Sequence, residues 1–321
     1  MSGNKKRSIA REHHYLPEFY LDQFANDEGL VTRTFKGPDG KLYEGAFTPK
    51  KIGRQRDLYS IQDGGPGFSV ARTDVIETDV FGPIDSNAAI TLRLLIEQGP
   101  DALTVVQREQ WATFVSSLLQ RHPRYLNERD VKARELVQDV IGRLAATWGP
   151  PPPGRRDVLA SMDVERVARY SLRAHLAKNI RDPRLVKSLS QLSAVTLTLP
   201  SDSPIKFVTG DNPVVVNLGQ PGPIHYFTLA LSPTVLIFCK NTSEPLEEDA
   251  PVGGLVVAQN VLVIQQSEFV FSQEPLSDGV PVRLRKCAQD ALRVVSAWPR
   301  NQRRPPSGPG RMDGPPGRGD G

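Results

Sequence analysis

Hydrophobic residues recur every three or four positions over much of the chain, which predicts a largely helical protein. The first run covers residues 76–95, and we expect Gly82-Pro83 to bend or restart this helix. A second helix follows a capping-box pattern at residues 104–107 and carries Trp111 on its apolar face. The same spacing marks further helices over residues 125–148, 164–180, 185–192, 252–265 and 283–296.

Short β-branched and aromatic runs, separated by Pro, Gly, Asn and Asp, replace the helical period between residues 193 and 240. They cover residues 195–199, 206–208, 214–216, 227–231 and 235–239. Nearer the start, a Gly-Pro-Asp-Gly turn at 37–40 predicts a hairpin, and residues 57–61 are a further strand candidate. This order predicts an α+β fold, mostly helical, with one small, mainly antiparallel β-sheet formed by the 193–240 strand block and the N-terminal hairpin.

The two ends of the chain differ in composition from the rest. We expect residues 1–11 to be a disordered basic arm and residues 300–321 a disordered Gly/Pro/Arg tail. Residues 12–299 are then expected to form a single α+β domain with an exposed proline-rich loop at 149–156.

The basic character of the protein resides in these ends. The formal charge of the chain is +4, and the first 12 residues carry +3 while the last 21 carry +2. The remainder therefore has a charge of −1, so the pI of about 9.1 describes the ends and not the expected domain. Any contact with a polyanion is expected to be weak and to run through these basic tails.

Absent motifs narrow the functional classes. The two cysteines, Cys239 and Cys287, are too few and unpatterned for a disulfide scaffold or a zinc finger. No P-loop, dinucleotide-binding glycine motif, metalloprotease helix or hydrolase nucleophile elbow occurs. No signal peptide and no apolar run of about 20 residues is present, so we expect no membrane contact and a cytoplasmic location. Hydrolases built from scattered carboxylates and histidines remain open.

The densest polar and aromatic cluster runs over residues 11–24 and contains the pair His13-His14. Leu16 and Phe24 have near-helical spacing with the aromatics between them, so this segment is expected to dock onto the core. Neighbouring side chains on an extended backbone point to opposite faces, so at most one of the two histidines easily joins a given site. Each is either an ordinary histidine held by backbone hydrogen bonds or a ligand or acid–base group.

A Thr-Gly-Asp-Asn-Pro turn between two strand candidates presents Asp211 and Asn212. Asp and Asn favour turns on their own account, and the alternative is that Asp211 is a catalytic or metal-binding carboxylate. Asn260 interrupts an apolar helix, where a buried amide needs a partner, and Asn212 and Asn260 are the candidate binding amides. Glu77 on the first long helix and Arg121 at the end of the second complete the candidates, with Asp85 as a lesser one.

The segment His-His-Tyr-Leu-Pro-Glu-Phe-Tyr-Leu at 13–21, followed by Phe24-Ala25, resembles the opening of the DUF4238 family of uncharacterised bacterial proteins. Further likenesses follow in the same order over roughly residues 12–272. They are Ile76-Glu77, the Arg121-x-Pro123 step, the turn at 209–213 and the Leu-Ala-Leu-Ser-Pro strand at 229–233. The resemblance implies family membership and this set of residues, and it implies no particular activity.

Two functional hypotheses remain. The first is a hydrolase, such as a metal-dependent nuclease or phosphodiesterase, with His13 or His14 as general base and Arg121 stabilising negative charge. A divalent metal is the cofactor this hypothesis allows, with Asp211, Glu77 and His14 as its ligands. The near-neutral body lacks the basic face expected of a nuclease. The second is a non-catalytic binding or sensor module, in which Arg121 pairs with Glu77 and His14 bonds the Asp211 turn in a buried network.

Overall fold

The computed structural model describes residues 11–60, 74–149, 163–218, 224–241 and 252–276. Helices predominate over strands, and all strand pairs are antiparallel, so the α+β class is confirmed. The basic arm (residues 1–10 of it), the C-terminal tail, the helix expected at 283–296 and all but the first residue of the proline-rich loop lie outside the described residues.

The strands in the described part of the chain form three sheets, where the sequence predicts one. One four-stranded sheet has the order β5-β9-β8-β7, with β5 Ser193–Thr198, β9 Val235–Lys240, β8 Ile224–Ala230 and β7 Val215–Leu218. The other has the order β3-β2-β10-β6, with β3 Leu42–Phe47, β2 Val31–Lys36, β10 Phe269–Ser272 and β6 Thr209–Gly210. The third pairs β1, Glu12–His14, with β4, Arg54–Arg56.

The N-terminal hairpin therefore does not join the sheet of β5, β7, β8 and β9, and from the 193–240 strand block it shares a sheet with β6 alone among the described strands. The hairpin itself is confirmed, with Lys36 opposite Leu42 beside the turn. Its free edge pairs instead with β10, which also pairs with β6. β10 has only four residues and follows an apolar helix, so it carries too little periodicity to be recognised as a strand from the sequence.

The predictions of short strands at residues 57–61 and 206–208 are wrong for the residues that the structure describes. Residues 57–60 form a turn directly after β4, because Asp57 adopts a left-handed backbone with φ of 56°. Residues 206–208 are not in a strand either: the backbone of this piece bonds to a side chain of a helix, as described below, and the paired residues are those of β6.

The helices match the sequence pattern closely. Their bounds are α1 Glu18–Leu21, α2 Gly82–Gln98, α3 Val105–Arg121, α4 Pro123–Trp148, α6 Val164–Ile180, α7 Pro183–Ser190 and α8 Val252–Gln266. A π-helical stretch, Ile76–Phe81, leads into α2 where Gly82-Pro83 was expected to disturb it. Short 3-10 turns occur at Asp22–Phe24, Pro49–Lys51 and Pro100–Ala102. None of the helices in the described ranges has the length and apolar character needed to cross a membrane.

Local signals explain where α3 begins and ends. Thr104 Oγ1 accepts a hydrogen bond from the Gln107 N–H, and Gln107 Oε1 accepts one from the Thr104 N–H, so the expected capping box is present. Pro123 cannot continue α3 and becomes the first residue of α4, with His122 as its N-cap. Arg121 and His122 are thereby held rigidly at the junction of two helices.

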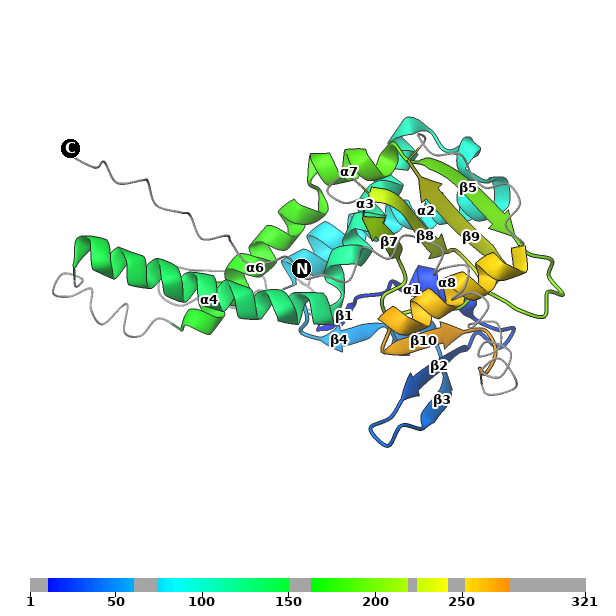
Figure 1. The fold of residues 1–321 in the computed structure, drawn as a ribbon, viewed down its shortest axis with the longest axis horizontal. Helices are drawn as coiled ribbons and strands as arrows, with labels where there is room; N and C mark the ends of the chain where they lie inside the picture. The colour runs from blue at the N-terminus through cyan, green and yellow to red at the C-terminus, as the bar shows by residue number, and fades with distance from the viewer. Residues whose placement is uncertain (1–10, 61–73, 150–162, 219–223, 242–251, 277–321) are drawn as a thin grey trace, which may run out of the picture.

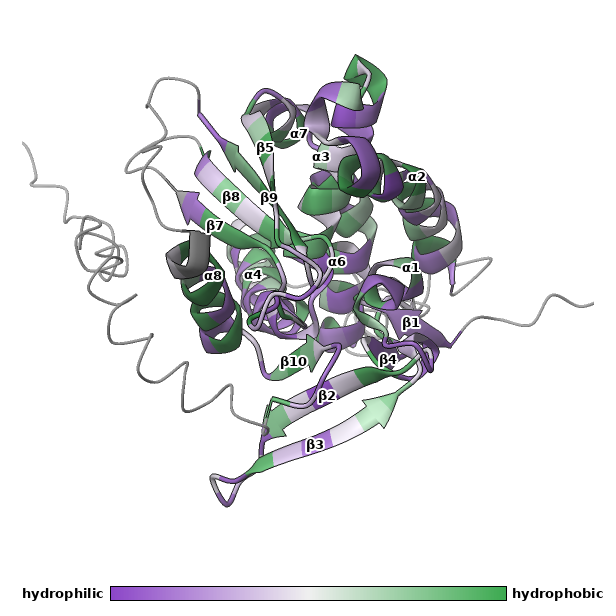
Figure 2. Ribbon diagram, turned by 90° about the vertical axis from the view of Figure 1, so that its right-hand side faces the viewer, coloured by the Kyte–Doolittle hydropathy of each residue, from purple (hydrophilic) through white to green (hydrophobic). Residues whose placement is uncertain are grey.

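Helices cover the β5-β9-β8-β7 sheet, and α4 and α6 extend away from it as an antiparallel pair (Figure 1). The apolar helix α8 lies between β7 and the β10-containing sheet, while α4 is mainly hydrophilic (Figure 2). One cluster of buried hydrophobic residues runs from Tyr15 to Phe271 and includes both four-stranded sheets. Leu16, Tyr20 and Phe24 are fully buried in it, so the N-terminal segment, residues 12–24, docks onto the core as expected.

Candidate functional site

His13 lies on β1 and is completely buried. Its Nδ1 accepts a 2.8 Å hydrogen bond from the backbone N–H of Tyr59, and the two rings stack with centroids 5.5 Å apart. An accepting Nδ1 requires that the neutral ring carry its proton on Nε2. His13 thus has the geometry of a histidine held by the backbone and not that of a solvent-reaching base.

His14 points to the other side of β1 and keeps 16% of its side chain exposed. Its Nε2 lies 3.4 Å from the Lys50 carbonyl oxygen and 3.6 Å from Glu18 Oε1. Burial lowers the pKa of His14, so the ring is mostly uncharged at neutral pH. The backbone N–H of His14 donates to Glu77 Oε1 at 3.4 Å, which brings these two predicted residues together.

Arg121 ends α3 and is completely buried. Its Nη1 donates to the two carboxylate oxygens of Asp85 at 3.0 and 3.2 Å, and the guanidinium lies 5.3 Å from the centre of the Phe81 ring. The expected pairing of Arg121 with Glu77 is therefore wrong: both carboxylates lie on one helical stretch, and only packing against α3 decides which meets the cation. Nε and Nη2 of Arg121 are buried and have no hydrogen-bond partner within the described ranges.

Glu77 lies in the π-helical stretch before α2. Its Oε1 accepts from His14, whereas its Oε2 is buried and has no partner among the described residues. Burial raises the pKa of Glu77 to about 7, although the charge of Arg121 opposes the rise. The carboxyl group is therefore distributed between its protonated and ionised forms at neutral pH.

Asp211 follows β6 and is 97% buried. Its Oδ1 accepts from the Glu268 N–H at 3.0 Å, and its Oδ2 lies 3.4 Å from His122 Nε2. The contact expected between His14 and the Asp211 turn is thus replaced by one with His122. This pairing depends on how α3, α4 and β6 pack together, so it cannot be predicted from local sequence. The one signal in the sequence is that His122 is adjacent to Arg121.

His122 has both ring nitrogens engaged. Nδ1 accepts from the backbone N–H of Arg124 at 3.2 Å and caps α4, so the proton of the neutral ring resides on Nε2 and faces Asp211. A histidine bonded in this way has no free nitrogen with which to take a proton from a substrate. The His122–Asp211 pair fastens the α3–α4 junction to the turn after β6.

Of the two candidate amides, the side chain of Asn260 is bonded inside the fold, whereas Asn212 contributes its backbone carbonyl. Asn260 Oδ1 accepts from the Val208 N–H at 3.0 Å and its Nδ2 donates to the Lys206 carbonyl at 2.8 Å. This side chain bonds the backbone on both sides of Phe207, whose own N–H donates to the Pro233 carbonyl at 2.8 Å, so residues 206–208 have no continuous ladder with a neighbouring strand. The backbone carbonyl of Asn212 accepts from Gln266 Nε2 at 2.6 Å.

The predicted residues divide into two groups. His14, Glu77 and Arg121 come together with Asp85, and we call these four the Glu77–Arg121 cluster; His13, Asp211, Asn212 and Asn260 make other contacts. Within the described ranges, no three His, Cys, Asp or Glu side chains are arranged to hold a metal ion. The ligand set expected from the sequence, Asp211, Glu77 and His14, is accordingly not assembled there.

Comparison with known proteins gives one match. The family model DUF4238, described as a protein of unknown function, matches residues 12–274. No curated protein and no solved structure matches the chain. The matched range begins and ends close to the first and last described residues, 11 and 276, and leaves out both basic ends.

Proposed function

Because the chain belongs to the DUF4238 family, whose description assigns no function, its chemistry has to be inferred from the site, and we propose that it is a hydrolase of phosphodiester or related bonds. In this proposal Glu77 transfers the proton and Arg121 stabilises negative charge on the substrate. Asp85 holds Arg121 in place, and His14 holds Glu77.

One observation carries the proposal: three polar atoms of the Glu77–Arg121 cluster are buried and have no hydrogen-bond partner among the residues that the structure describes. They are Glu77 Oε2 and Arg121 Nε and Nη2. Leaving a buried polar group unpaired costs about 1–3 kcal/mol, and more for charged groups, so such atoms call for an explanation. The Glu77 carboxyl can exchange a proton with a reacting group, and the two N–H groups of Arg121 can donate hydrogen bonds to a negatively charged oxygen. Together they offer both kinds of contact that the hydrolysis of a phosphoester needs.

The protonation state of Glu77 suits this role. A general acid–base group works best when its pKa is near the working pH, and burial raises the pKa of Glu77 to about 7. Ionised Glu77 would accept a proton from a water molecule as the water oxygen forms a bond to phosphorus. The protonated carboxyl would then return that proton to the leaving oxygen as its bond to phosphorus breaks, which regenerates Glu77.

Arg121 would contribute electrostatically during the same step. Its free N–H groups are fixed by the Asp85 pair, so they would stabilise charge that develops on the substrate oxygens without reorganising. Asp85 and His14 keep 23% and 16% of their side chains exposed, which places solvent on their side of the cluster. A small phosphoester would reach the cluster from that side.

Hydrolysis of a chromogenic phosphodiester, bis(p-nitrophenyl) phosphate, by the full-length protein tests the proposal. We expect Glu77→Gln to lower kcat by about 10²–10⁴-fold, the usual contribution of a general acid–base group. Glu97→Gln, which changes an exposed carboxylate of α2, is the matched control and should retain activity. Absence of hydrolysis by the unsubstituted protein with this diester, its monoester and p-nitrophenyl acetate would refute the hydrolase.

A separate observation favours the second candidate, a binding or sensor module with a structural polar network. Hydrogen bonds and close contacts with other residues of the fold engage the side chains of His13, His122 and Asp211. On this reading the unpaired atoms of Glu77 and Arg121 bind a small polar ligand without transforming it. The two candidates differ in one measurement, since only the hydrolase releases p-nitrophenol in a Glu77-dependent manner.

A further inference from the structure

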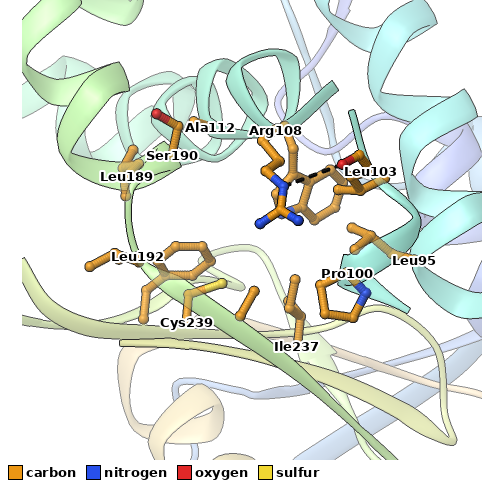
Figure 3. Close-up of a pocket in the computed structure, with 13 residues that line it drawn as sticks. Leu95, Pro100, Leu103, Arg108, Ala112, Leu189, Ser190, Leu192, Ile237 and Cys239 are labelled. Carbon is orange, nitrogen blue, oxygen red and sulfur yellow. Dashed lines mark hydrogen bonds between the residues drawn. The ribbon is translucent and has the colours of Figure 1, made fainter. Parts of the chain in front are cut away.

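The cavity between helices α2, α3 and α7 and strands β8 and β9 is too small to hold an organic ligand. Its volume is about 30 Å³, and Leu95, Arg108 and Ile237 are among the side chains that line it (Figure 3). This is about the space that one water molecule needs. A surface with exposed aromatic rings and unpaired cations lies instead on the sheet β3-β2-β10-β6, whose β2–β3 hairpin projects from the rest of the described fold (Figure 1).

Three aromatic side chains form a row across this sheet. Tyr43 on β3 is opposite Phe35 on β2, and Phe35 is opposite Phe269 on β10, so all three lie on the same face. The rings of Phe35 and Tyr43 stack with centroids 5.5 Å apart, and those of Phe35 and Phe269 are 5.7 Å apart. Tyr43 is 45% exposed and the other two are partly exposed. The face therefore presents aromatic rings to solvent beside the edge strand β3.

Arg33 adds a cation to this row of rings. It precedes Phe35 by two residues on β2, so its side chain points to the same face. The guanidinium carbon lies 4.5 Å from the centre of the Phe47 ring and 5.4 Å from that of Phe269. No Asp or Glu in the described ranges forms an ion pair with Arg33, whose side chain is partly exposed. A bound anion would supply the missing counter-ion.

The same face is covered by the fold at its other end. Phe271 on β10 is opposite both Arg33 and Thr209, and Phe271 and Thr209 are buried. The hydroxyl groups of Tyr20 and Thr209 lie 2.7 Å apart, so the N-terminal segment covers the face at β6. The open part, which we call the aromatic surface, consists of Arg33, Phe35, Tyr43, Phe47 and Phe269.

The chain around the aromatic surface is basic. Residues 31–56 contain seven Lys and Arg and two Asp and Glu, a net charge of +5, although residues 13–300 as a whole carry −1. The two arginines of β4 pair with acidic neighbours. Lys36, Lys50 and Lys51 are exposed, and none of them pairs with a carboxylate in the part of the chain that the structure describes. Such a local excess of positive charge attracts a polyanion.

We propose that the aromatic surface binds single-stranded nucleic acid, with bases stacked on Phe35 and Tyr43 and phosphates bound by Arg33, Lys50 and Lys51. A single strand alternates flat aromatic bases with phosphates, which matches exposed rings bordered by unpaired cations. An acidic peptide would pair with the cations and leave the rings uncovered. The proposal concerns binding alone, so it does not depend on the proposed hydrolase.

Fluorescence anisotropy of labelled oligothymidylate and oligouridylate of about 12 nucleotides, added to the full-length protein, tests the proposal. Binding of either strand at least tenfold more tightly than a duplex of the same length is expected, because duplex bases are already stacked. A glutamate peptide of similar length should compete at least tenfold less well than an unlabelled strand, because it offers charge without rings. Equal affinity for the duplex, or equal competition by the peptide, would overturn the proposal.

Substitutions on β3 test the stacking. Tyr43→Ala should weaken binding about 5- to 150-fold, the effect of losing one stacked base, and Tyr43→Phe should retain the affinity because it keeps the ring. Leu42→Ala is the matched control and should not change binding. Leu42 is 56% exposed and adjacent to Tyr43, but it points to the opposite face. If Tyr43→Ala binds as tightly as the unsubstituted protein, the strand binds elsewhere, such as at the basic ends, and the proposal is wrong.

A double substitution, Lys50→Gln with Lys51→Gln, tests the phosphate contacts. It should lower the slope of log affinity against log salt concentration by about 1.4, since each phosphate contact on a single strand contributes about 0.7. Lys132→Gln with Lys187→Gln removes the same charge from exposed positions on α4 and α7 and should leave the slope unchanged. Equal slopes of the two double variants, or no binding of either strand at about 100 μM protein, would also overturn the proposal.

Discussion

The side chain of His13 accepts the backbone N–H of Tyr59 at 2.8 Å, and Tyr59 in turn donates its hydroxyl to the Arg121 carbonyl at 2.7 Å. A residue of the N-terminal segment is thereby linked through a turn to the end of α3. All three residues are fully buried. The link means that the N-terminal segment is part of the structural support of the Glu77–Arg121 cluster.

Substitution His13→Ala should destabilise the protein by about 1–3 kcal/mol, because it leaves the buried Tyr59 N–H without an acceptor. Loss of the stacked ring contact adds to this effect. Urea unfolding followed by circular dichroism measures the change. His175→Ala, at an exposed position on α6, is the control and should change stability by less than about 0.5 kcal/mol. Equal effects of the two substitutions would contradict the structural role of His13.

The raised pKa of Glu77 makes stability depend on pH. Its pKa is about 7 in the folded protein and near 4.5 in the unfolded chain, so the folded state binds the proton more tightly. The resulting stabilisation is fully present below about pH 4.5 and is lost as the pH rises through about 7. Glu77→Gln removes this dependence. Relative to the unsubstituted protein, the variant should gain about 1–3 kcal/mol between pH 5 and pH 8.

Unfolding free energies of both proteins at pH 5 and pH 8 measure this difference. Glu97→Gln should show no such gain, since this carboxylate is exposed on α2. A constant difference between the unsubstituted protein and Glu77→Gln at the two pH values would mean that Glu77 titrates alike in the folded and unfolded chain.

The Arg121–Asp85 pair should contribute far more than a surface pair. Asp85→Ala leaves a fully buried guanidinium without its counter-ion and should cost about 3–5 kcal/mol. The pair of Arg143 with Asp139 on α4 is a matched comparison, with both side chains at least 60% exposed, and Asp139→Ala should cost less than about 1 kcal/mol. Chemical denaturation distinguishes the two. Similar losses would show that burial of Arg121 carries no penalty.

His122 and Asp211 are expected to be energetically coupled. His122→Ala, Asp211→Asn and the double variant form a mutant cycle, and their buried contact predicts a coupling energy of about 0.5–3 kcal/mol. Unfolding measurements on the four proteins give this value. A cycle between Asp211→Asn and His175→Ala should be additive within about 0.5 kcal/mol. Additivity in both cycles would remove the proposed tether between the α3–α4 junction and the turn after β6.

Local patterns were sufficient for most of the helices and for the hairpin. The capping box at Thr104 and the apolar spacing of α6 act through neighbours only a few residues away, so the sequence alone predicted where α3 begins and where α6 lies. The docking of the N-terminal segment was predictable for the same reason. Its apolar residues repeat at helical spacing and have to be buried.

Pairing between distant segments was not predictable in this way. The strand β10 and the partners of Arg121 and Asp211 depend on contacts between residues 36 to 240 positions apart in the chain. The local sequence pattern does not distinguish the carboxylate of Glu77 from that of Asp85. The packing of α2 against α3 decides that Asp85 pairs with Arg121, while one oxygen of Glu77 has no partner among the described residues.

By itself the sequence determined the α+β class, the approximate positions of most described helices, the charge of the ends and a set of polar residues that includes His14, Glu77 and Arg121. Tertiary structure alone decided that His13 and Asp211 are tied into the fold and that Asp85 belongs to the cluster. The physical reason is that periodicity and capping are short-range, whereas burial and the pairing of charges arise only when separate elements pack together.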